Sequence, residues 1–437
     1  MARLSFLALA ASVLAGTVAA SCPKPLIIDS DFGSFDDDPL ALGLANIFQL
    51  WGEAEILAVV ISTDYKLAAP AVDAIDTFYK HPDIPIAINK PLSDATQTAE
   101  YATPYGDYIT GLTYDFPEDV RTGYNTTTPL ALYRKYLSEA ADKSVTIVLI
   151  GNTINLYALM ESPADSYSPL SGIELIRAKV AELAVQAAAN GKSYNLYSEK
   201  PLDAEFVVDN WPADVPLTYI GSNIGGNVRF GARLTTELDL SVNPVAYTFN
   251  HSVGYNLSYK TWDATAMYYA VRGLDDVYAF NFTKGHDVAD ANATTSWLNN
   301  GYNSSENGVV FAANGIGNAT FAARLEEILL WQPGDAIPAS LTKNTQCSTS
   351  MPSGVASSVA ASTVVASSGV ASASGVAVAT GVTSVAGAAT ATGAATATGG
   401  ASTATVSVVP VSSAVKATTL FGSKIVAALV AAFVLFN

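Results

Sequence analysis

Short runs of consecutive apolar residues alternate with longer amphipathic segments between residues 25 and 330. The short runs are rich in β-branched residues, which is typical of strands buried on both faces of a sheet. They predict strands at 25–28, 55–62, 84–88, 145–150, 182–186 and 217–220. The amphipathic segments predict helices at 40–50, 69–81, 130–140, 155–161, 202–210, 263–271 and 321–330. This alternation predicts an α/β fold, a mostly parallel central sheet flanked by helices in a single large domain.

The apolar pattern changes at the two ends of the chain. At the start, Arg3 precedes an apolar run and the small residues Val18-Ala19-Ala20, which predicts a secretory signal peptide over residues 1–20. At the end, the apolar run 425–436 is too short for an ordinary membrane-spanning helix. Small residues and a polar spacer precede it, so residues 420–437 resemble a GPI-attachment signal. The alternative is a frayed or weakly membrane-associated C-terminus.

Residues 348–419 consist almost entirely of Ser, Thr, Ala, Val and Gly, with neither acidic nor aromatic residues. Such a segment lacks the large side chains that a packed core needs. We interpret it as an O-glycosylated stalk. The folded part is therefore predicted at residues 21–347.

The predicted domain is strongly acidic. Of the 22 basic residues, Arg3, Lys416 and Lys424 lie outside it, so 19 basic residues face 39 acidic ones, a net charge of about −20. This charge disfavours a nucleic-acid partner, whose phosphates are negative as well. It is compatible with a cation or a neutral small molecule.

Two further patterns fit an exported protein. Cys22 and Cys347 are the only cysteines and bracket the domain, which predicts a disulfide between them. Seven N-x-S/T sequons predict exposed, glycosylated asparagines. They begin at Asn125, Asn250, Asn256, Asn281, Asn292, Asn303 and Asn318.

Five aspartates follow the first predicted strand within ten residues: Asp29, Asp31, Asp36, Asp37 and Asp38. Ligands of open α/β sheets bind at the carboxyl ends of the strands, where this turn would lie. So many carboxylates repel one another, and hard oxygen ligands gather around Ca²⁺ or Mg²⁺. The cluster therefore predicts a divalent-cation site. The alternative is a solvated acidic loop with Asp37 or Asp38 as the N-cap of the next helix.

The run IIDSDFGSFDDDPLAL resembles the nucleoside hydrolase signature D-T-D-P-G-x-D-D-A-x-A-L, with two extra residues between Gly33 and the paired acids. Six later segments resemble further blocks of that family, in the same order. They are EILAVVIS, AVDAIDTFYKHPDIPIAI, VTIVLIGNTINLYAL, KVAELAVQ, DAEFVVDNWP and TWDATAMYYAVRG. The resemblance implies a Rossmann-like nucleoside hydrolase fold and hydrolysis of the N-glycosidic bond of ribonucleosides.

The resemblance also implies a Ca²⁺ cofactor and assigns its ligands. They are Asp31, Asp38, the backbone carbonyl of Ile154 and Asp263. Asp31 would in addition be the general base that takes a proton from the attacking water. Asp29 and Asp36 would be supporting acids.

Ribose and base recognition are assigned in the same way. Asp37 and Asn195 would bind the ribose hydroxyls. Trp262 stands where family members that accept pyrimidines carry a catalytic His, and it resembles the purine-preferring branch, whose Trp stacks on the base. The alternative makes Trp262 a core aromatic residue. Ser193 replaces a ribose-binding Glu, and Asn190 is only a substitute for a second ribose-binding Asn, so recognition of the sugar is weaker than in the family.

Three hypotheses follow from the sequence. The first is a secreted or surface-anchored, Ca²⁺-dependent purine nucleoside hydrolase that meets a membrane or cell wall only through its lipid anchor. The second is a weakly active or non-catalytic descendant that binds metal and nucleoside. The third is a displayed cell-surface structural protein. The oligomeric state is left open.

Overall fold

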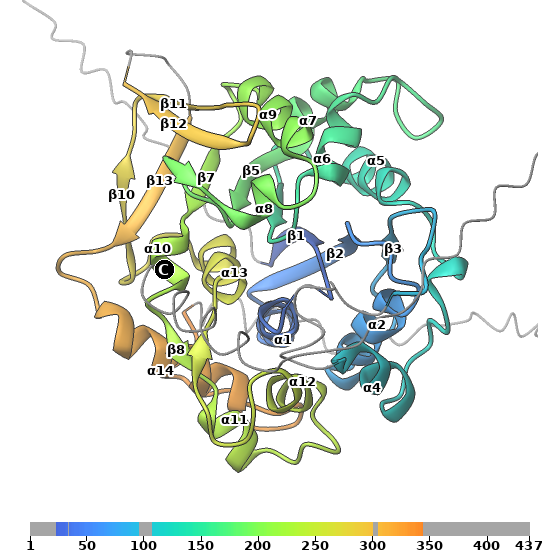
Figure 1. Cartoon of the computed structure of the whole chain (residues 1–437), viewed down its shortest axis with the longest axis vertical. Coiled ribbons are helices and arrows are strands. Elements are labelled where there is room, and N and C mark those ends of the chain that lie inside the picture. Colours follow the sequence, from blue (N-terminus) through green and yellow to red (C-terminus); the bar gives the residue numbers. More distant parts are fainter. Residues whose placement is uncertain (1–22, 34, 96–106, 300–304, 344–437) are drawn as a thin grey trace, which may run out of the picture. The chain divides into compact units, whose positions relative to one another are not determined.

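The computed structural model describes residues 23–33, 35–95, 107–299 and 305–343, which belong to one compact unit (Figure 1). The predicted signal peptide, stalk and C-terminal tail lie outside the described residues, as do Cys22, Cys347 and Asn303. Within the described ranges, no helix combines the length and the apolar character needed to cross a bilayer.

An eight-stranded sheet forms the centre of this unit. Its strands, in spatial order, are β10 (Tyr278–Phe282), β13 (Glu306–Phe311), β7 (Leu217–Ile220), β5 (Val180–Val185), β4 (Val145–Leu149), β1 (Lys24–Ser30), β2 (Ala54–Ile61) and β3 (Ile86–Ile88). All neighbouring pairs are parallel except β10 and β13. The predicted α/β class with a mostly parallel sheet is therefore confirmed. Parallel strands all end at the same edge, so the loops that follow them gather there.

Helices cover both faces of the sheet (Figure 1). On one face lie α1 (Asp37–Leu50), α2 (Ala68–Phe78), α4 (Tyr108–Asp115), α12 (Pro244–Ser252), α13 (Asp263–Arg272) and α14 (Gly317–Leu330). On the other lie α5 (Pro129–Glu139), α6 (Ile154–Met160), α7 (Gly172–Lys179) and α9 (Pro201–Asn210). Alternate strand residues serve the two layers: Leu26 and Ile28 pack in the first, and Ile27 packs in the second. This explains why the strand is apolar throughout.

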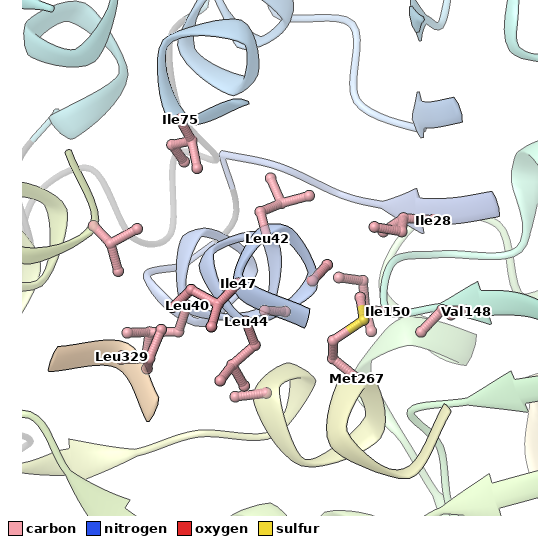
Figure 2. Close-up of a cluster of buried hydrophobic side chains, with 14 of the residues drawn as sticks. Ile28, Leu40, Leu42, Leu44, Ile47, Ile75, Val148, Ile150, Met267 and Leu329 are labelled. Carbon is pink, nitrogen blue, oxygen red and sulfur yellow. The ribbon is translucent and has the colours of Figure 1, made fainter. Parts of the chain in front are cut away.

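Helix α1 is the centre of the first layer and is buried on all sides from Asp37 to Phe48. Figure 2 shows Leu42 pointing toward Ile75 of α2, and Met267 of α13 lying beside Ile150. A helix that is apolar all round must be enclosed by other elements. The first layer thus holds α1 in a fixed position, with its N-terminus at the carboxyl edge of the sheet.

Shorter elements complete the unit. A three-stranded sheet has the order β11 (His286–Ala289), β12 (Thr294–Leu298) and β6 (Gly191–Lys192), and a two-stranded sheet pairs β8 (Arg229–Phe230) with β9 (Tyr259–Lys260). The remaining helical segments are η1 (Gly123–Asn125), α8 (Tyr194–Tyr197), α10 (Ser222–Gly225) and α11 (Ala232–Glu237). The apolar pattern predicts none of these, because they are short and mostly polar.

The predicted strands and helices are present, with shifts at their ends. Helix α2 stops at Phe78, three residues before the predicted end, because Lys80 has a left-handed backbone with φ of 69°. Strand β3 begins at Ile86, two residues late, because Pro85 has no N–H to give to a sheet. Strand β10 at one edge of the sheet and its neighbour β13 were not predicted.

The two ends of the described domain meet at a buried ion pair. The guanidinium of Arg272, at the end of α13, donates to both carboxylate oxygens of Glu53 at 2.8 and 2.9 Å. The Lys24 N–H donates to the Glu53 carbonyl at 3.1 Å, and the Lys343 N–H donates to its carboxylate at 3.3 Å. The first and last described segments are thereby joined to the same residue.

The described sequon asparagines lie at or near the surface. Five are exposed and Asn250 is half-buried; the exposed ones are Asn125, Asn256, Asn281, Asn292 and Asn318. Their glycosylation stays a prediction.

The convergence on Glu53 leads to a prediction for the two cysteines. Cys22 precedes Lys24 by two residues, and Cys347 follows Lys343 by four. Extended segments of these lengths reach about 7 and about 13 Å, respectively. We expect non-reducing peptide mapping of the protein, expressed through an oxidising secretory pathway, to recover Cys22 and Cys347 in one disulfide-linked peptide. Replacing both cysteines by Ser should lower the free energy of unfolding by about 2–4 kcal/mol. Two free thiols in the oxidised protein would contradict the prediction.

Candidate metal and nucleoside site

The aspartate cluster lies where β1 ends and α1 begins, at the carboxyl edge of the sheet (Figure 1). All five of its carboxyl groups are buried, with exposures of 0–6%. Asp36 is the N-cap residue of α1, and its side chain makes no capping bond. The alternative interpretation as a solvated acidic loop is therefore wrong. Carboxylates buried to this degree need a partner that compensates their charge.

Asp263 joins the cluster from the first residue of α13. One carboxylate oxygen of Asp37 accepts the backbone N–H groups of Trp262 and Asp263 at 3.0 and 3.3 Å. Carboxylate oxygens of Asp37, Asp38 and Asp263 consequently lie within 4.8 Å of one another. Three buried carboxylates at this spacing fit a hard divalent cation, which prefers oxygen ligands.

The electrostatics of the group lead to the same conclusion. Burial raises the pKa of Asp38 well above its ordinary range, and the neighbouring Asp31 and Asp37 raise it further. Burial also raises the pKa of Asp263 strongly, with Asp37 and Asp38 as additional causes. None of the ion pairs formed by the described residues includes Asp37, Asp38 or Asp263. A bound cation would stabilise the ionised form of all three.

The resemblance assigns Asp31 to the metal and Asp37 to the ribose, whereas the group within 4.8 Å contains Asp37. Asp31 is 5% exposed and close enough to raise the pKa of Asp38 and Asp263. Ile154 is the first residue of α6, the helix that follows β4 along the chain. The roles of Asp31, Asp37 and Ile154 stay predictions.

Asp29 is held by two uncharged donors from separate helices. The Tyr133 hydroxyl of α5 donates to one carboxylate oxygen at 2.8 Å, and the Asn155 amide of α6 donates to the other at 2.9 Å. Burial is the main cause that raises the pKa of Asp29 to about 7, while these two bonds act in the opposite direction. Asp29 is thus tied to the second helical layer, which agrees with a supporting role.

Two close approaches hold the strand ends and the helix starts together. A Cβ atom on Gly151 would lie 2.3 Å from the backbone nitrogen of Asp31, so only glycine lets the chain after β4 pass the end of β1. A Cβ atom on Gly225 would lie 2.4 Å from the Cα of Trp262. A side chain at Gly151 or Gly225 would therefore push the backbone of Asp31 or Trp262 away from its place beside the carboxylates.

Trp262 is half-buried and is the N-cap residue of α13, directly before Asp263. Its backbone carbonyl accepts the Thr265 hydroxyl at 2.6 Å, and the Lys260 ammonium lies 5.7 Å from its ring. The backbone of Trp262 is thus fixed beside the carboxylates, while part of its ring is open to solvent. Trp262 belongs to neither of the two apolar layers, which does not support the alternative of a core aromatic residue.

The predicted ribose residues follow β5. Asn195, in α8, donates its amide to the Ile150 carbonyl at 2.8 Å and to the Gln186 side chain at 3.1 Å. The Ser193 hydroxyl accepts the Ala188 N–H at 2.6 Å. Asn190 is exposed. Protein groups already occupy the Asn195 amide donor and the Ser193 hydroxyl, and the ribose-binding role of Asn195 stays a prediction.

Several residues near the cluster were not found from the sequence. The Ser30 hydroxyl donates to Asp38 at 2.5 Å and accepts the Phe32 N–H at 3.1 Å. The Tyr108 hydroxyl donates to the Phe35 carbonyl at 2.6 Å. Burial raises the pKa of Tyr108 well above its ordinary range, and Asp38 and Asp36 add to this. Ser30 lies inside the signature itself, which was a usable signal, whereas nothing local indicates Tyr108, Tyr133 or Asn155.

Similarity to known proteins was found at the level of structure. No protein-family model and no curated protein matches the chain. A plant nucleoside hydrolase is 18% identical with a TM-score of 0.50, over 70% of this chain and 98% of that one. A purine-preferring ribonucleoside hydrolase from Gardnerella vaginalis is 14% identical with a TM-score of 0.52, over 70% and 97%. An inosine-uridine preferring nucleoside hydrolase from Bacillus anthracis is 13% identical with a TM-score of 0.51, over 70% and 99%.

These similarities confirm the predicted fold: the chain has the α/β fold of the nucleoside hydrolases. Identities of 13–18% show the fold alone. The buried group of Asp37, Asp38 and Asp263 is a candidate metal site of this chain.

The carboxylate group leads to a prediction about metal binding. Adding Ca²⁺ at about 100 times its dissociation constant should stabilise the folded protein by about 2.7 kcal/mol, seen as a rise in the unfolding midpoint that a chelator reverses. Asp38→Asn and Asp263→Asn should each abolish most of this rise. The control is Asp94→Asn, which removes a carboxylate that is 89% exposed and should keep the full rise. Equal rises in all variants would contradict a metal at this site.

Proposed function

We propose that the chain is an extracellular, Ca²⁺-dependent nucleoside hydrolase that cleaves purine ribonucleosides to the free base and ribose. The observation that carries the proposal is the buried group of Asp37, Asp38 and Asp263 at the carboxyl edge of a nucleoside hydrolase fold. Secretion and the lipid anchor rest on the sequence patterns, and the choice of calcium and the purine preference rest first on the resemblance to the nucleoside hydrolases.

The chemistry requires three tasks at one place. Cleaving an N-glycosidic bond develops positive charge on the sugar, so negative groups around the ribose stabilise the transition state. Asp37, Asp38 and Asp263 would hold the cation, which when bound supplies the charge that orients the ribose hydroxyls and acidifies the attacking water. Asp31, buried beside this group, would take the proton of that water.

The leaving base is the remaining task. The three histidines of the chain are His81, His251 and His286, and none lies in α13 or the aspartate turn. His81 is bonded to the Asn46 side chain at 2.8 Å, and burial lowers its pKa to about 4. Trp262, half-buried beside Asp263, offers a flat ring instead. Stacking favours a large aromatic base, which supports the purine preference.

The first test is product release. The full-length secreted protein is incubated with inosine, guanosine, adenosine and uridine, and free base and ribose are measured with calcium and with a chelator. We expect base and ribose in equal amounts from the purine nucleosides, and none with the chelator. Absence of release from every nucleoside at ample protein and calcium would contradict the proposal.

Asp31→Asn tests the general base. Loss of the carboxylate should lower kcat by about 10²–10⁴-fold, the usual contribution of a positioned base. The calcium-induced rise in the unfolding midpoint, measured in the same variant, separates loss of the base from loss of the metal. A kcat within a few-fold of the unsubstituted protein would remove Asp31 from the mechanism.

Trp262→Ala tests base recognition. Removing the ring should raise KM for inosine and guanosine by about tenfold, a loss near 1.4 kcal/mol that is typical of one aromatic contact. The KM for uridine should change less, so the purine preference should fall. An equal effect on both classes would mean that Trp262 does not select the base.

A second function is supported by one observation. The Ser193 hydroxyl and the Asn195 amide are bonded within the protein, and Ser193 replaces a ribose-binding acid. A descendant that binds nucleosides without turning them over would have such a site. Calorimetric binding of inosine without release of base would favour this function, and neither binding nor release would favour a displayed scaffold.

A further inference from the structure

The segment from Gln186 to Asn195 follows β5 along the chain. It includes Asn195, which is predicted to bind the ribose, and Asn190 and Ser193, which stand at two further ribose-binding positions of the family. It leaves the carboxyl end of β5, makes a turn, passes through the two residues of β6, and enters α8. A short segment with little regular secondary structure makes few hydrogen bonds within itself. Its position must therefore be set by groups from elsewhere in the fold.

Thr295, on β12, contacts this loop from more than one hundred residues away along the chain. Its hydroxyl lies 3.0 Å from the Ala188 carbonyl and 3.1 Å from the Gly191 carbonyl, and it accepts the Gly191 N–H at 3.2 Å. A threonine hydroxyl has one proton to donate, which here points to one of the two carbonyls or is shared between them, and one of its two lone pairs accepts the Gly191 N–H. Thr295 is 2% exposed, so water does not replace it easily.

The same turn is closed from its other side by Ser193. The Ala188 N–H donates to the Ser193 hydroxyl at 2.6 Å, while the Ser193 carbonyl accepts the Leu196 N–H at 3.0 Å in the first turn of α8. Asn195 lies within that turn and donates to the Ile150 carbonyl at the end of β4. A displacement of the turn at Ala188 would therefore reach Asn195 through Ser193.

The strand that carries Thr295 is itself braced by the body of the domain. The Asp287 N–H, on β11, donates to the Glu306 carboxylate of β13 at 2.9 Å. The Ala289 N–H donates to the Asp209 carboxylate of α9 at 2.9 Å. The β11–β12 hairpin lies next to α9 and to strand β13 of the central sheet (Figure 1). The hairpin therefore holds Thr295, and with it the contacted loop, in a fixed position relative to the central sheet.

We infer that Thr295 is a positioning residue for nucleoside recognition, whose hydroxyl fixes the turn at Ala188–Gly191 and through it Ser193 and Asn195. The inference rests on the proposed function for its kinetic consequence, but the mechanical part concerns the loop itself. Positioning matters because a misplacement of about 1 Å in a recognition group can cost about 10²-fold in rate.

Three variants separate positioning from general stability. Thr295→Val removes the hydroxyl while keeping the shape, and Thr295→Ser keeps the hydroxyl. Thr248→Val is the matched control, because Thr248 is also fully buried and donates to a carbonyl, that of Pro244 at 2.9 Å within α12. We expect Thr295→Val to raise KM for inosine by about tenfold with a smaller change in kcat. Thr295→Ser should stay within about twofold of the unsubstituted protein, and Thr248→Val should leave KM unchanged.

Hydrogen exchange tests the loop without any need for turnover. Thr295→Val should speed amide exchange in residues 186–198 relative to Thr248→Val, and Thr295→Ser should not. In the unsubstituted protein, the Gly191 amide should be protected, which is a test that needs no variant at all. Fast exchange at Gly191, or unchanged loop exchange in Thr295→Val, would overturn the inference. A protein that hydrolyses no nucleoside but shows the expected exchange would refute the proposed function and keep the positioning role.

Discussion

The site depends on one contact, in which the Asp37 carboxylate accepts the backbone N–H groups of Trp262 and Asp263. This contact places the N-terminus of α1 against the N-terminus of α13. The positive ends of two helix dipoles then face the same group of carboxylates, which offsets part of their mutual repulsion. Asp38 lies on α1 and Asp263 on α13, so this contact helps to set the distance between two carboxylates that a cation would share.

Helix α13 is fixed at its other end by a second acidic residue. Arg272, in its last turn, is paired with Glu53, which follows α1 by three residues. The two helices therefore run side by side, and each end of α13 is bound to an acid that flanks α1. Breaking a buried pair of this type typically costs about 3–5 kcal/mol. Stability and site geometry are consequently linked: the contacts that close the domain also set the distance between the metal-binding candidates.

The uncharged donors around the cluster show how the fold holds so many acids. Ser30 binds Asp38, and Tyr133 and Asn155 bind Asp29, each from a different element. A hydrogen bond to an ionised carboxylate compensates burial without adding a competing cation. Even with these donors, the carboxylates of Asp37, Asp38 and Asp263 have no cationic partner among the described residues, and a bound cation would balance their charge.

The sequence by itself determined the main strands and helices, because continuous β-branched runs can be satisfied only in a sheet covered on both faces. It also located the aspartate turn and paired it with Asp263 through an ordered series of motifs. The tertiary structure alone decided which carboxylates meet, since oxygens of Asp37, Asp38 and Asp263 come within 4.8 Å of one another only in the fold. It likewise revealed Thr295, Tyr133 and Asn155, whose contacts depend on backbone positions far apart in the chain. The local sequence predicts whether a segment forms a strand or a helix. The distances between segments depend on the order of the strands and the packing of the helices, which only the folded chain defines.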